Sequence, residues 1–100
     1  MMNKIQLFNA KSAGLPMEDG TMFECVAVGT YADTDKDGNP VTASAFAAKG
    51  GEVYTAIGAG IAASVEMLDD ILAEEGSVTI EVVVSKTNSG RDFKQIRIVE

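Results

Sequence analysis

The spacing of apolar residues changes twice along the chain, and this feature constrains the fold most. Up to Ile57 the apolar residues lie mostly in short extended runs, between Ile61 and Leu72 they recur at helical spacing, and after Gly76 they alternate again. One hundred residues have room for one hydrophobic core. We therefore expect a single domain over residues 1–100, built from strands, a helix and further strands.

Three strands are predicted before the helix. They are the runs MFECVAVGTY over residues 22–31, VTASAFAA over 41–48 and EVYTAI over 52–57. The sequence DKDGNP joins the first two runs, and Gly50-Gly51 joins the last two. Both linkers are typical of tight turns between antiparallel strands, so the sequence predicts a meander.

One helix and two further strands follow the meander. The helix ends at Gly76 and has one apolar face, while the stretches 78–86 and 91–99 alternate with a period of two around a turn at 87–90. The first residues, KIQLFNA, are interpreted as an extra strand. The apolar face of the helix consists of Ile61, Val65, Leu68 and Leu72.

This order of elements is typical of an OB-fold. We expect a mainly β protein, an OB-fold-like five-stranded antiparallel barrel with one α-helix between strands 3 and 4. A split α+β sandwich is the alternative. OB-folds bind oligonucleotides or oligosaccharides on strands 2 and 3 and on the neighbouring loops, so these regions are the first place to look for a site.

Composition argues against catalysis and against export. The chain has no His, and its single Cys25 lies in an apolar strand, where it is interpreted as a core residue and not as a nucleophile. We expect no enzyme activity, no cofactor and no bound metal. No stretch is long enough to span a membrane, and no secretory signal precedes the first strand. A soluble intracellular protein is therefore predicted.

The net charge of −7 is unevenly distributed. Five acids and no base lie between Glu66 and Glu75, and three acids with Lys36 lie in the turn that begins at Asp33. The rest of the chain holds seven acids and seven bases, so a local basic surface is compatible with the composition.

The turn YADTDKDGNPVT resembles the first half of a calcium-binding loop. Asp33, Asp35 and Asp37 alternate and Gly38 follows, but the position of the closing Glu is occupied by Ser44. Strands also flank the turn where a calcium loop needs helices. We interpret it as a solvated hairpin turn.

A glycine pair at the start of the helix matches the G-x-G-x-x-A pattern of dinucleotide-binding folds, with Gly58 and Gly60 as the glycines. The chain lacks the repeated βαβ units that form such a site. The glycines are therefore interpreted as a tight entry turn that also brings the helix close to the sheet.

Aromatic residues point to a nucleic-acid surface. Tyr54 alternates with Val53 and Ile57, and Phe93 shares a strand face with Arg97, so both rings are expected on the solvent-facing side. Bases stack on such rings while nearby cations contact phosphates. Phe46 is a further candidate, although a core position is favoured for Phe46, Phe8 and Phe23.

Several segments together resemble one protein family, the single-stranded DNA-binding proteins of small protein-primed Bacillus phages. They are IQLFNA, AVGTY, FAAKGGEVYTAI, IAASVEMLDDIL and VSKTNSGRDFKQIRIV, and the resemblance covers residues 3–99. It implies a protein without enzyme activity that coats and protects single strands displaced during phage DNA replication, without sequence preference, in the cytoplasm of a bacterial host. Tyr31 and Tyr54 match positions where the family carries stacking aromatics.

The resemblance also implies single-stranded DNA as the partner, with self-association along DNA and replication proteins as further partners. Few bases predict weak binding with a shallow salt dependence. The alternative is a small OB-like interaction module that holds a protein partner on the same β face or on the acidic helix. The candidate DNA-binding residues are Tyr31, Phe46, Lys49, Tyr54, Lys86, Arg91, Phe93, Lys94 and Arg97.

Overall fold

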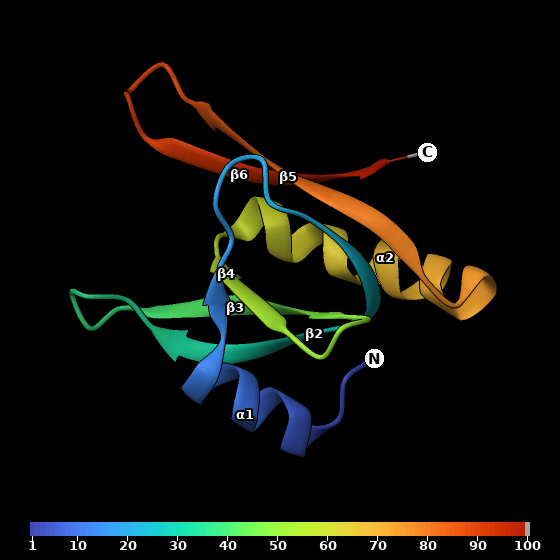
Figure 1. Ribbon diagram of the computed structural model, residues 1–100. Helices are drawn as coiled ribbons and strands as arrows, with labels where there is room; N and C mark the ends of the chain where they lie inside the picture. The colour runs from blue at the N-terminus through green and yellow to red at the C-terminus, as the bar shows by residue number, and fades with distance from the viewer. Residues whose placement is uncertain (100) are drawn as a thin grey trace.

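A computed structural model describes residues 1–99 (Figure 1). The five predicted strands and the helix expected after Ile57 are present, and the fold is mainly β as predicted. The elements in chain order are α1 (Lys4–Ala13), β1 (Leu15–Pro16), β2 (Met22–Thr34), β3 (Pro40–Ala48), β4 (Val53–Ile57), α2 (Ala59–Glu75), β5 (Val78–Lys86) and β6 (Asp92–Val99).

The strands form one six-stranded sheet in the order β1-β4-β3-β2-β5-β6. β1 pairs in parallel with β4, and the other neighbours pair antiparallel. The long strand β2 pairs with both β3 and β5, and the register shifts between Cys25 and Ala27, where a bulge lets the strand bend. The sheet curls around α2 as a half-barrel with β1 and β6 at its two edges (Figure 1). This architecture is compatible with an OB-like fold, but the expected five strands with one helix between strands 3 and 4 are wrong in number and placement: the sheet has six strands, and α2 lies between β4 and β5.

The prediction of a strand at KIQLFNA is wrong, because these residues form α1. A capping box starts the helix: the Asn3 side chain accepts a hydrogen bond from the Gln6 backbone N–H, and the Gln6 side chain accepts one from the Asn3 N–H. The two bonds satisfy amide groups that a helix start otherwise leaves unpaired.

Two apolar clusters cover the two faces of the sheet. The predicted face of α2 is buried against one side, where Phe46, Val28 and Ile80 complete the main core. A smaller cluster on the other side holds Leu7 and Ala10 of α1 against β2, β3 and β4. Burial of each large aliphatic side chain contributes about 1.5–3 kcal/mol, so α2 is the main support of the sheet.

The segment between β1 and β2 crosses the open side of the half-barrel. It begins after Pro16 of β1, which pairs with β4, and its Met17 is fully buried in the interior. It then reaches β5, where Val82 accepts a backbone hydrogen bond from Gly20 and donates one to Thr21. The Asp19 carboxylate also accepts the Val84 N–H. These contacts hold β1 and the end of α1 beside β4.

The hairpin turn predicted between β2 and β3 is present. The Asp35 carboxylate accepts the backbone N–H groups of Asp37 and Asn39, and Gly38 adopts a φ of 82°. Gly is favoured at such a positive φ, because a Cβ would clash there. Neither helix in residues 1–99 is long and apolar enough to span a membrane.

Candidate nucleic-acid interface

Three surface hollows meet at Ile57, the last residue of β4, whose side chain is 48% exposed. Their volumes are about 400, 460 and 290 Å³. We call them together the Ile57 cleft. It lies where β4 passes into α2, between the β2–β3 and β5–β6 hairpins, which extend to the same side of the molecule (Figure 1). The residues lining the cleft include Lys11, Tyr31, Asp33, Thr42, Thr55, Gly58, Gly60, Asp92, Phe93 and Lys94.

Tyr31 contributes an aromatic ring to the first hollow. It lies on the α1 side of β2, half-buried against the smaller cluster, so its ring is held by packing before any ligand arrives. Burial and the Asp33 carboxylate raise the pKa of its hydroxyl, while the Thr55 side chain lowers it. The two effects that raise the pKa both favour the neutral phenol.

Phe93 contributes a second ring at the other end of the cleft. Its ring lies over the start of α2, because Gly60 has no side chain: a Cβ there would come within 2.8 Å of the ring. The ring remains 39% exposed. Of the two glycines that resemble a dinucleotide motif, Gly60 thus allows Phe93 to pack closely on the helix, while Gly58 adopts a φ of 151° at the helix start.

Lys94 contributes positive charge to the cleft. Within residues 1–99 neither Lys94 nor Arg91 forms an ion pair, whereas Lys11 lies 4.0 Å from Asp33. The first turn of α2 carries no acid and its cap residue Gly58 offers no side chain, so the backbone N–H groups there add positive potential. The side chains that line the cleft include two lysines and two aspartates, so they carry no net charge, whereas the whole chain carries −7.

Six of the nine predicted site residues do not line the cleft, and three of these six are Tyr54, Phe46 and Lys49. Tyr54 is on the opposite sheet face from Tyr31, half-buried beneath α2 and stacked on Phe23. Phe46 is fully buried, so it has no exposed ring face. Lys49 follows the far end of β3 and pairs with Glu24 at 3.5 Å.

The other predicted cations belong to the β5–β6 hairpin. Lys86 pairs with Asp92 at 3.3 Å, and Arg97 pairs with Glu81. Arg91 is exposed in the turn that precedes β6, next to Asp92 of the cleft. The structure therefore brings together Tyr31, Phe93 and Lys94, with Arg91 near them.

Lys11 and Ile57 are cleft residues that the sequence interpretation missed. The predicted strand KIQLFNA stops one residue before Lys11, whereas the helix that forms there includes Lys11. Asn3 with Gln6 three residues later is the sequence signal for that helix. Ile57 was assigned to a covered aliphatic face with Val53, but α1 covers only the Val53 end of β4.

The candidates for other chemistry do not form a second site in residues 1–99. Cys25 is fully buried, and burial raises the pKa of its thiol to about 11, which disfavours the reactive thiolate. No cluster of three or more acidic or thiol side chains in this part of the chain could hold a metal ion.

The comparison with protein families assigns the chain to a family. Residues 1–99 match the family described as phage single-stranded DNA-binding protein. No curated protein and no solved structure is significantly similar to the chain. The match spans nearly the whole chain, and the chain therefore belongs to the phage single-stranded DNA-binding protein family.

Proposed function

We propose that the Ile57 cleft is the surface on which this family member binds single-stranded DNA. The observation that supports it is the convergence of two aromatic rings, Tyr31 and Phe93, with two lysines, Lys11 and Lys94, around an exposed aliphatic residue. Aromatic rings stack on any base and lysines attract any phosphate. Binding there is independent of sequence, and the protein acts by coating displaced strands during phage replication.

The phosphates run past Lys94 toward Arg91, and the bases turn toward the rings. This arrangement uses the two cations of the β5–β6 side that have no acidic partner in residues 1–99. Ion-paired cations such as Lys49 and Arg97 contribute less, because their positive charge is already offset by a carboxylate. With few free cations, affinity per site is low and its salt dependence is shallow.

Tyrosine fluorescence tests which surface is used, because the chain has no Trp and only two Tyr. Titration with oligothymidylate should quench the emission of the parent protein. The quenching should disappear in Tyr31→Phe and persist in Tyr54→Phe, since only Tyr31 lines the cleft.

A mobility-shift assay on both variants separates binding from its reporter. Both variants should still bind DNA, because a phenylalanine ring stacks on bases like a tyrosine ring. Quenching that instead depends on Tyr54 would place DNA on the α2 side of the sheet and overturn the assignment to the cleft. If the parent protein does not bind DNA, the proposed function is wrong.

A further inference from the structure

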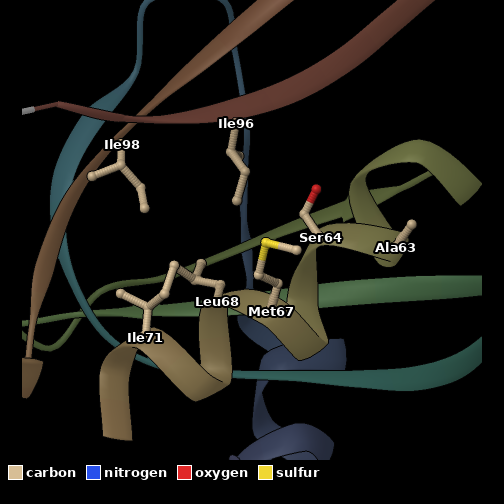
Figure 2. A pocket seen from close by; sticks show the side chains of 7 residues that line it. All are labelled: Ala63, Ser64, Met67, Leu68, Ile71, Ile96 and Ile98. Atoms are coloured by element: carbon tan, nitrogen blue, oxygen red, sulfur yellow. The ribbon is translucent and has the colours of Figure 1, made fainter. Parts of the chain in front are cut away.

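An apolar groove runs between α2 and β6 and adjoins the Ile57 cleft at Ala63, which lines both (Figure 2). Its volume is about 380 Å³, and its lining is aliphatic except for Ser64. Met67 and Ile71 of α2 face Ile96 and Ile98 of β6 across it (Figure 2). Met67 is 71% exposed and Ile98 is 40% exposed, so the groove presents side chains that the core does not cover.

A row of carboxylates borders this groove. Glu66, Asp70 and Glu74 recur every four residues on α2, directly beside the row that contains Met67 and Ile71. All three are exposed, and α2 carries no base. The groove therefore favours an apolar ligand flanked by positive charge.

The outer face of α1 has the complementary character. Ile5 and Phe8 are three residues apart, so they share one face of the helix, and they are 74% and 72% exposed. Phe8 is not the core residue that its sequence pattern favoured. Lys4 lies beside Phe8 on the same helix and forms no ion pair within residues 1–99, and α1 carries no acid.

We propose that α1 of one copy docks into the α2–β6 groove of a second copy. Ile5 and Phe8 fill the groove, and Lys4 faces the row of Glu66, Asp70 and Glu74. The apolar atoms leave water, while the opposite charges fix the register.

The contact joins two different surfaces of the same chain. α1 and α2 pack on opposite faces of the sheet, so a bound copy still offers its own free groove or its own free α1. Such a heterologous contact extends head to tail. The contact is small and therefore weak in free solution, and it strengthens when copies are held side by side on one strand. The inference does not rest on the DNA-binding assignment and is tested without DNA.

Sedimentation equilibrium of the full chain without DNA, from about 10 μM to about 1 mM, covers the range expected for a weak contact of this size. The average mass of the parent should rise with concentration beyond that of a dimer. Phe8→Ser and Met67→Glu should each weaken association at least about tenfold. Both side chains are largely exposed, so circular dichroism should show an unchanged fold. Met22→Ser removes an exposed apolar side chain of β2 outside both surfaces and should behave as the parent.

A mixing experiment identifies the geometry. The Phe8→Ser copy keeps its groove and the Met67→Glu copy keeps its α1, so an equal mixture should form one-to-one dimers and nothing longer. In a single chain, Lys4→Glu should weaken association and Asp70→Lys should restore it. A parent that stays monomeric over the whole range overturns the proposal and leaves the groove for another occupant. Association that survives Phe8→Ser or Met67→Glu, or a mixture that stays monomeric, overturns it as well.

Discussion

The ring of Tyr54 stacks on that of Phe23, with centroids 4.3 Å apart and planes inclined by 17°. The stack joins β4 to β2, which are not neighbours in the sheet, and both rings pack against the main core under α2. An aromatic residue of the kind expected to receive DNA therefore stabilises the fold.

Replacement of Tyr54 by Ala should lower the free energy of unfolding by about 2–4 kcal/mol, because it removes a packed ring and the stacking of that ring on Phe23. Tyr54→Phe keeps the ring and should stay within about 0.5 kcal/mol of the parent, since the change removes only a hydroxyl. Urea denaturation followed by circular dichroism measures both values. A loss below about 1 kcal/mol for Tyr54→Ala would show that the stack contributes little.

Tyr31→Ala should weaken oligothymidylate binding by about 1–3 kcal/mol, the usual contribution of one stacked base. The slope of log affinity against log salt should stay unchanged, because no charge is lost. Tyr31→Leu is the matched control: it preserves apolar packing against α1 but cannot stack, so it should bind as weakly as Tyr31→Ala. Affinity close to that of the parent in Tyr31→Leu would indicate packing instead of stacking.

Lys94→Ala should reduce the magnitude of the same salt slope by about 0.7, the value for one phosphate contact on a single strand. Lys49→Ala is the control, since Lys49 pairs with Glu24 and lies beyond the far end of β3. Its slope should match that of the parent. Equal changes of the salt slope in Lys94→Ala and Lys49→Ala would mean that the positive charge of a lysine contributes to DNA binding regardless of its position.

Local pattern predicted β2 to β6, α2 and the side-chain alternation along these strands, because these follow from periods of two and 3.6 residues, but it missed β1 and took the start of α1 for a strand. Tyr54 does lie opposite Val53, as predicted. The pattern of β4 could not reveal that a second layer covers the other face: α1 covers Val53 while α2 covers Tyr54. Which face of β4 is exposed to solvent therefore depends on elements that are distant from β4 in the sequence.

The cleft depends on long-range geometry in the same way. Lys11 and Lys94 are 83 positions apart, and they meet only because the sheet curls and the segment around Met17 holds α1 beside β4. Tyr31 became a candidate through the family resemblance, Phe93 through the strand face that it shares with Arg97, and Lys94 as a cation near these rings. The sequence favoured a core position for Phe46, which is buried, but it could not separate Lys94 from Lys49, since ion pairing is a property of the folded chain.

Alkaline pH should destabilise the protein through Cys25. Burial raises the pKa of this thiol from 9.0 to about 11. Below pH 9 the thiol keeps its proton in both the folded and the unfolded chain, so Cys25 does not change the free energy of unfolding. Between pH 9 and 11 only the unfolded chain releases this proton, which favours unfolding. The stability lost through Cys25 across that window is on the order of 2–3 kcal/mol.

Urea denaturation at about pH 8 and about pH 10.5 measures this loss. Tyr31, whose pKa is also raised, contributes in the same alkaline range, so Cys25→Ala is needed to isolate the thiol. The variant should lose less stability than the parent between the two pH values. Identical losses in parent and variant would mean that the thiol is not protected by the fold.

The acidic hairpin should tune DNA affinity. Asp33 lines the cleft and offsets Lys11 at 4.0 Å, whereas Asp37 lies at the hairpin tip outside it. Asp33→Asn removes a negative charge beside the DNA path and frees Lys11, so binding at low salt should tighten by about two- to fivefold. The pKa of Tyr31 should fall in the same variant, because the Asp33 charge raises it. Ultraviolet absorbance titration measures that change.

Asp37→Asn makes the same change of charge in the same hairpin and is the matched control for position. It should leave affinity and the Tyr31 pKa near those of the parent, because Asp37 lines none of the three hollows. Asp35 has a different role, since its carboxylate accepts two backbone N–H groups of the turn. Asp35→Asn retains an acceptor and should keep stability, while Asp35→Ala should cost about 1 kcal/mol. If Asp33→Asn and Asp37→Asn tighten binding equally, the hairpin acts only through net charge, and Asp33 has no special place beside the DNA.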